Sequence, residues 1–261
     1  MVNILIDSSL DGRNACYLAY SQPSKLLYLV GDSGGGLLPP LTPGGAGIAS
    51  NSQCTVNAAG LTVDGGGDAL ALTIALTFSA SFAGNQAVYL AARDREGGNS
   101  GWQPLGTWNV PGPPVSGLSV SPMTPAESSS FFQTYTFTFA DTNGSQDIAV
   151  TDILINNALD GRQACYMAFV PQTRALLLVD DAGDAAGPYQ GFVVGDWHDA
   201  SNSQCTVSGV GSSVDSYGNV VILKLGIAFT GSFAGNRVFY VATRSSSGTS
   251  GWQTVGSVAV P

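Results

Sequence analysis

The chain contains 261 residues, carries a formal net charge of −9 and has only 10 % charged residues. Its nine Lys and Arg residues form no run or stripe, which argues against nucleic acid and against an anionic membrane surface as partners. The low charge and the 34 Gly residues favour short strands and turns over amphipathic helices. The most apolar stretch, 69–82, alternates with Thr and Ser as a strand does, so we predict no transmembrane helix.

The sequence contains two copies of one unit. LDGRNACYLAY begins at Leu10 and LDGRQACYMAF at Leu159, while SNSQCTV, SFAGN and SGWQ also occur once in each copy. Matched residues lie 149 positions apart from Cys16 to Cys165 and 151 apart from Cys54 to Cys205. We therefore predict two domains, 1–111 and 112–261, joined by a Pro-rich linker at 111–114 that acts as a semi-rigid spacer.

The first copy starts later in the repeat than the second. Extrapolated backward, Met1 matches Val150, so the segment 115–149 has no counterpart before the first copy. We expect the 261 residues to be a fragment of a longer repeat protein, and the first domain to lack its N-terminal strands. The open sheet edges would then accept a strand from a neighbouring chain and promote self-association. Alternatively, the 115–149 segment also packs onto the first copy.

The second copy shows the strands of the complete unit. Residues 134–139 alternate strictly between Thr and an aromatic residue, which is the pattern of a strand with one face in a core. Further strands are predicted at 148–155, 163–170, 175–179, 205–207, 220–229, 237–243 and 252–260, separated by turn residues. Seven or eight strands without a helical period predict an all-β fold with two packed sheets.

The four cysteines fall two per copy at matched positions. We expect one disulfide in each copy, Cys16 with Cys54 and Cys165 with Cys205, each closing a loop of about 40 residues. Disulfides require an oxidising compartment, so we expect a secreted or cell-surface protein, although no signal peptide is visible at Met1. The alternative is two buried free thiols per domain in a cytosolic protein.

Several segments carry a resemblance to a known class of protein. The hairpins VYLAARDREGGNSGWQ from Val88 and FYVATRSSSGTSGWQ from Phe239 resemble the last two strands of bacterial immunoglobulin-like and fibronectin type III-like extracellular modules. The FADTNGSQDI, LDGRQACYMAF, LLLVDDAG, SNSQCTV and SFAGNR segments resemble a repeat of large surface or secreted proteins of soil bacteria. The resemblance implies two tandem immunoglobulin-like or fibronectin III-like antiparallel β-sandwiches that serve as stalks, adhesive units or binding domains beside enzymes.

Two acidic segments of the second copy are candidate calcium sites, because Ca²⁺ takes six to eight oxygen ligands. The first holds Asp141, Asn143 and Asp147, and the second holds Asp180, Asp181 and Asp184. In the first copy only Asp181 has a match, which is Asp32. The alternatives are a capped β-turn for the first segment and a solvated loop for the second.

The loop 183–200 differs most between the copies and supplies the candidate ligand-binding residues. It carries Tyr189, Phe192, Trp197, His198 and Asp199, where the first copy has the Gly- and Pro-rich 34–47 segment. Exposed aromatic rings beside carboxylates form sugar-binding faces, although Phe192 and Trp197 equally suit the cover of a core edge. Since His198 is the only histidine, a zinc site of several histidines is excluded.

These features favour a non-catalytic structural or adhesive module of a secreted or cell-surface repeat protein. A repeated unit suits stalks and multivalent binding, with a glycan, a protein ligand or neighbouring repeats as partners. The alternative is a metal-assisted hydrolase acting on a lactone, ester or glycoside through the acidic loops, or a carbohydrate-binding module attached to such an enzyme. Calcium is the only cofactor that the sequence suggests.

Overall fold

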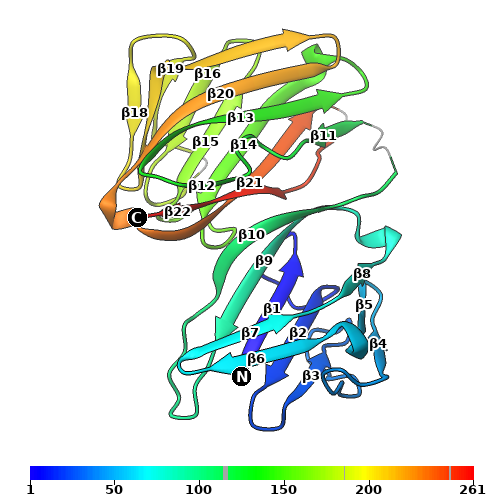
Figure 1. Cartoon of the computed structure of the whole chain (residues 1–261). Coiled ribbons are helices and arrows are strands. Elements are labelled where there is room, and N and C mark those ends of the chain that lie inside the picture. Colours follow the sequence, from blue (N-terminus) through cyan, green and yellow to red (C-terminus); the bar gives the residue numbers. More distant parts are fainter. Residues whose placement is uncertain (114–116, 185, 247) are drawn as a thin grey trace. The chain divides into compact units, whose positions relative to one another are not determined.

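The structure, a computed structural model, describes residues 1–113, 117–184, 186–246 and 248–261. Throughout these ranges the chain is all-β (Figure 1). The helical segments of the described chain are four short 3-10 turns: η1 (Ala58–Gly60), η2 (Ala80–Phe82), η3 (Ser145–Asp147) and η4 (Gly231–Phe233). None of the helices in those ranges has the length and apolarity that a membrane crossing needs.

The chain divides into two compact units. The first unit holds Met1–Gln103 and Val110–Pro113, and the second holds Pro104–Asn109 and the chain from Pro114 to Pro261. Of the predicted linker at 111–114, Pro114 lies outside the described residues. The two units are described separately below.

The second unit contains a seven-stranded and a five-stranded sheet. The seven-stranded sheet has the order β12 (Glu127–Ser129), β22 (Gln253–Val260), β21 (Gly235–Ser245), β14 (Ile148–Asn156), β15 (Cys165–Val170), β16 (Ala175–Val179) and β17 (Tyr189–Val193). The five-stranded sheet has the order β11 (Leu118–Val120), β13 (Phe132–Asp141), β20 (Val220–Phe229), β19 (Cys205–Tyr217) and β18 (Asp199–Ser201). Neighbouring strands are antiparallel except β12 and β22, which run parallel.

The core of the second unit lies between these two sheets, an arrangement consistent with a β-sandwich. The predicted alternation of β13 is confirmed, because Tyr135, Phe137 and Phe139 are at most 1 % exposed. Opposite them in the same cluster lie side chains of β14 and β21, including Ile153 and Phe239. The aromatic face of β13 therefore forms one wall of this core.

The first unit contains a five-stranded, a three-stranded and a two-stranded sheet. The five-stranded sheet has the order β10 (Gln103–Val110), β9 (Gly84–Ala92), β1 (Val2–Asp7), β2 (Cys16–Ser21) and β3 (Leu26–Leu29); of β10, the residues Pro104–Asn109 are grouped with the second unit. The three-stranded sheet has the order β4 (Ile48–Ser50), β5 (Cys54–Asn57) and β8 (Leu76–Phe78), and the two-stranded sheet pairs β6 (Thr62–Gly66) with β7 (Ala69–Thr73).

The strands at 118–141 belong to the second unit. β11 pairs with β13, β13 pairs with β20, and β12 pairs with β22. In the part of the chain that the structure describes, the sheets of the first unit contain no strand that corresponds to β13.

Both predicted disulfides are confirmed. Cys16 bonds to Cys54 and Cys165 bonds to Cys205, in each case with Cα atoms 5.6 Å apart. Each bond joins two different sheets of its unit, from β2 to β5 and from β15 to β19. Two such bonds in one chain indicate an oxidising environment such as the extracellular space.

Candidate functional site

A pocket of the second unit lies beside Tyr189. Its volume is about 560 Å³, within the usual range for small-ligand sites. The pocket is formed where β16 ends, β17 begins and β18 ends. Its lining residues are Leu178, Val179, Asp180, Asp181, Pro188, Tyr189, Gln190, Ser201, Asn202 and Ser203. It therefore brings together one predicted binding residue and two predicted metal ligands.

Asn202 fixes the wall of this pocket through four hydrogen bonds. Its Nδ2 donates to the carbonyl oxygens of Ala164 at 2.8 Å and Val179 at 3.1 Å. Its Oδ1 accepts from the backbone N–H groups of Gln204 and Cys205, both at 3.0 Å. One side chain thus ties the residue before β15 and the last residue of β16 to the start of β19, next to the disulfide.

The acidic residues near the pocket bond mainly to the backbone. Asp181 Oδ1 accepts from the Ser203 N–H at 3.1 Å, and Asp181 Oδ2 accepts from the Ser203 hydroxyl. Asp180 accepts from the Ala182 N–H at 3.1 Å, and Asp184 accepts from the Ala186 N–H at 2.8 Å. These are the contacts of turn-capping carboxylates.

The first unit repeats the framework of this pocket but has no match for the side chains of Tyr189 and Gln190. Asn51 donates to Ala15 at 2.9 Å and Val30 at 3.0 Å, and Asp32 accepts from the Ser52 N–H at 3.1 Å. The same contacts in two copies identify Asn202 and Asp181 as scaffold residues. Tyr189 and Gln190 are specific to the second copy, and Tyr189 is 41 % exposed.

The structure separates the five residues predicted to bind a ligand. Tyr189 starts β17 and faces the pocket, whereas Trp197, His198 and Asp199 follow the far end of that strand, about 13 Å along it. Phe192 is 7 % exposed and belongs to the core, as the alternative reading of this loop proposed. The sequence region expected to be one long loop contains β17.

Trp197 and His198 form an exposed aromatic turn. Trp197 is 76 % exposed, and its ring centroid lies 3.8 Å from that of His198. Asp196 accepts from the Trp197 N–H at 2.6 Å and lies 3.0 Å from His198 Nδ1. The Trp197 N–H and, next, the His198 ring hold the pKa of Asp196 below its usual value. Asp199 accepts from the Gly209 N–H at 3.1 Å.

The first predicted calcium segment forms a turn after β13. Asp141 is 1 % exposed, and its Oδ1 accepts from the Asn143 N–H at 2.9 Å. Asp147 Oδ1 lies 3.4 Å from the Ser246 hydroxyl. Within the described ranges, no three His, Cys, Asp or Glu side chains gather in a way that could hold a metal ion. Calcium binding stays a prediction, and the contact that Asp141 makes with the Asn143 N–H is that of a turn.

A polar cluster on the seven-stranded sheet was not predicted from the sequence. Asp152 Oδ2 pairs with Arg244 Nη2 at 2.9 Å, and the Asp152 side chain is only 5 % exposed. Tyr166 and Trp252 complete a cleft of about 260 Å³ with their rings edge to face at 6.2 Å. Burial, together with the nearby Asp152 carboxylate, raises the pKa of Tyr166 to about 12. The sequence feature that could have revealed this cluster is Asp152, a carboxylate within the otherwise largely apolar strand at 148–155.

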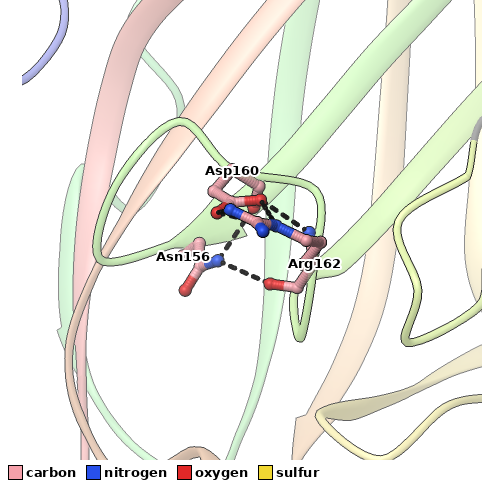
Figure 2. Close-up of polar contacts among 3 residues, drawn as sticks. All are labelled: Asn156, Asp160 and Arg162. Atoms are coloured by element: carbon pink, nitrogen blue, oxygen red, sulfur yellow. Dashed lines mark hydrogen bonds and ion pairs between the residues drawn. The ribbon is translucent and has the colours of Figure 1, made fainter.

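A second polar group closes the loop after β14 (Figure 2). Asn156 Nδ2 donates to the carbonyl oxygens of Asp160 at 2.9 Å and Arg162 at 3.3 Å. Arg162 bonds to the Asp160 carboxylate through Nε and Nη2, the latter at 2.6 Å. These bonds and the Arg162 backbone N–H lower the pKa of Asp160 to about 2. Asp11 and Arg13 repeat this pair in the first unit, also at 2.6 Å.

No protein-family model matches the chain, and a search of curated proteins also finds no match.

Proposed function

We propose that the chain is a non-catalytic extracellular module of two tandem immunoglobulin-like domains, which serves a structural or adhesive role in a secreted or cell-surface repeat protein. The observation that carries this proposal is the repetition of one disulfide-linked framework in both units. Stalks and multivalent binders need repeated units, whereas a catalytic centre needs only one copy of its residues.

The polar side chains at the pocket support the same conclusion. Asp181 and Asn202 make backbone hydrogen bonds that Asp32 and Asn51 reproduce. A scaffold role explains why these contacts occur in both units. The residues that remain for function are those specific to the second copy.

We place the adhesive contact at the pocket beside Tyr189. The half-exposed phenol ring offers an apolar face for a sugar ring. Gln190 and Asp180, on the pocket wall, supply amide and carboxylate groups for sugar hydroxyls. Because both are uncharged or acidic, we expect a neutral or basic glycan rather than an acidic one.

The test is binding of the 261-residue chain to a glycan array and to soluble polysaccharides. We expect Tyr189→Ala to weaken binding at least about tenfold, and Tyr189→Phe to retain it. Trp197→Ala is the matched control, since it removes an exposed ring at the far end of β17. Absence of binding to every glycan would leave only a spacer role, and equal loss with Trp197→Ala would move the site to the aromatic turn.

The alternative function is a metal-assisted hydrolase of a lactone, ester or glycoside. It is favoured by one observation: Asp180 and Asp181 line the same pocket as Tyr189. Two carboxylates can divide acid and base roles, or hold a cation that polarises a carbonyl. Turnover of chromogenic substrates that both EDTA and Asp181→Ala abolish would support this function. Lack of turnover, or turnover unchanged by both, would remove it.

A further inference from the structure

The first unit has an apolar strip that its own strands cover only in part. Six of its core-facing side chains are half-buried, whereas each of their counterparts in the second unit is 0 % exposed. The strip consists of Ile4, Leu70, Leu72, Ile74, Leu76 and Val88. The counterparts are Ile153, Val221, Leu223, Leu225, Ile227 and Phe239. The side chains of the two sets are similarly apolar, so the difference in exposure comes from what lies over them.

In the second unit, β13 covers the matching side chains. It runs antiparallel to β20, with Tyr135 opposite Leu225 and Phe137 opposite Leu223. The Tyr135 ring lies 4.7 Å from the Phe239 ring, and the Phe137 ring lies 6.1 Å from it. The aromatic face of β13 thus fills the space over β20 and β21.

β7 and β8 of the first unit match β20 of the second unit, and on the side away from β13 their pairing is the same in both units. In the first unit, Thr62 of β6 pairs with Thr73 of β7. The matching residues of the second unit, 151 positions later, are Ser213 of β19 and Lys224 of β20, and they also pair. β8 pairs with β5 as β20 pairs with β19. In the described ranges, β7 ends its two-stranded sheet, so its outer edge presents backbone N–H and C=O groups in the place where β20 meets β13.

We infer that the outer edge of β7 and the apolar strip bind an extended strand donated by a partner polypeptide, in which aromatic and hydroxyl residues alternate as in β13. Main-chain hydrogen bonds supply affinity in this mode, and the alternate side chains supply specificity. The repeat offset sets the register: the residue equivalent to Tyr135 lies opposite Ile74, and the residue equivalent to Phe137 lies opposite Leu72. The proposal concerns the first unit and does not depend on glycan binding by the second.

The donor strand is not β13 of a second copy of this chain. Tyr135, Phe137 and Phe139 are at most 1 % exposed in their own unit. Their withdrawal would uncover the core of the second unit while it covered the first, so exchange between copies gains no burial. A free strand with the same pattern gains the full burial of its aromatic face.

The probe is a synthetic peptide with the sequence of residues 131–141, followed by a tri-lysine tail for solubility. Fluorescence anisotropy with the 261-residue chain should show saturable binding. We expect Leu72→Asp, which places a carboxylate in the strip, to weaken binding at least about tenfold. Ala71→Asp is the matched control, because Ala71 is exposed on the opposite face of the same strand, and it should bind within about twofold of the parent chain.

Changes in the peptide test the same contact without any risk to the fold of the chain. A peptide with both Tyr135→Asp and Phe137→Asp, and the same tail, should not bind. For the register, Thr73→Cys should form a disulfide with a Thr136→Cys peptide in preference to a Thr138→Cys peptide. Three results would overturn the proposal: no binding of the parent peptide, equal binding to the parent chain and Leu72→Asp, or a chain dimer that forms by exchange of β13 in the absence of peptide.

Discussion

Asp7 and Asn156 occupy matched positions at the last residue of β1 and β14, but only the amide carries N–H donors, which do not depend on pH. Asn156 uses its Nδ2 to hold the carbonyl groups of Asp160 and Arg162. In the first unit, burial raises the pKa of Asp7 to about 6, and the nearby Asp11 adds to the rise. The same loop is therefore closed by a neutral group in one unit and by a titrating group in the other.

This difference predicts a pH dependence confined to the first unit. The folded pKa of Asp7 lies above the reference value of 3.8, so the folded state binds the proton more tightly than the unfolded state. Its contribution to stability is fully present below about pH 4 and is lost as the pH rises through about 6. We expect Asp7→Asn to remove this dependence and to stabilise the first unit by about 1 kcal/mol at pH 7.5, after allowance for solvent screening.

Hydrogen exchange measured by mass spectrometry separates the two units and checks this prediction. The matched control is Asn156→Asp, which should introduce the same pH dependence into the second unit. A pH profile of the first unit that is unchanged by Asp7→Asn would contradict the assignment.

The ion pair between Asp152 and Arg244 predicts a second pH effect. Burial raises the pKa of Asp152, and the Arg244 guanidinium opposes part of that rise. Arg244→Gln leaves a nearly buried carboxylate unpaired, so we expect a loss of about 2 kcal/mol at pH 7. Because the folded pKa then rises further, the variant should recover stability as the pH falls.

Asp152→Asn in the Arg244→Gln background is the control, since the first unit has Asn3 at this position, 3.2 Å from the Tyr17 hydroxyl. Urea denaturation of the parent chain, Arg244→Gln, Asp152→Asn and the double variant, at pH 5 and pH 7, gives all four corners of the double-mutant cycle. If Arg244→Gln alone does not lower the free energy of unfolding at pH 7, the Asp152 carboxylate is too well solvated to depend on its ion pair with Arg244.

Asp181 allows a test between a scaffold role and calcium binding. Asp181→Ala removes the hydrogen bonds from the Ser203 backbone N–H and hydroxyl, so we expect a loss of about 1 to 2 kcal/mol in the second unit. The loss should be the same in EDTA and in calcium. A calcium site would instead show a thermal midpoint that rises with calcium in the parent chain and not in the variant.

Reduction of the disulfides should unfold the first unit before the second. The bridges span 38 and 40 residues, and each stabilises its unit by about 4 kcal/mol in the chain-entropy account. The first unit has a half-buried apolar strip in place of the covered core of the second, so it has less stability to lose. Thermal unfolding in reductant, monitored by hydrogen exchange, measures this order. Unfolding of both units at the same temperature would contradict it.

Local patterns predicted most strands of the second unit. The 175–179 and 220–229 strands match β16 and β20 at both ends, and the Thr and aromatic alternation at 134–139 lies within β13. β17 was missed because its YQGFV sequence has no period of two and contains Gly191. β19 extends to Tyr217 because pairing with β20, a long-range contact, continues it past a bulge.

The candidate site was predictable only in part. The composition of the 183–200 loop identified Tyr189, but the pocket also needs Ser203 and Gln190, which the Asn202 hydrogen bonds and the β16–β17 pairing bring to it. The sequence also grouped Phe192 with its neighbours, since side-chain direction within an unrecognised strand cannot be read from composition. Asp181 has a match in Asp32 of the first unit, whereas Tyr189 and Gln190 have none, so the sequence alone separates these two kinds of residue.

The hydrogen bonds of Asn51 and Asn202 hold the loops 34–47 and 183–200 in a way that would allow one loop to be exchanged for another. In each unit the side chain of Asn51 or Asn202 fixes the end of one strand and the start of another mainly through backbone atoms. The loop between them, 34–47 in the first unit and 183–200 in the second, is where the copies differ most. Backbone anchoring of this kind makes no demand on the sequence that it encloses. The 34–47 segment of the first unit is therefore a natural place to graft foreign loops, with the 183–200 segment as a first donor.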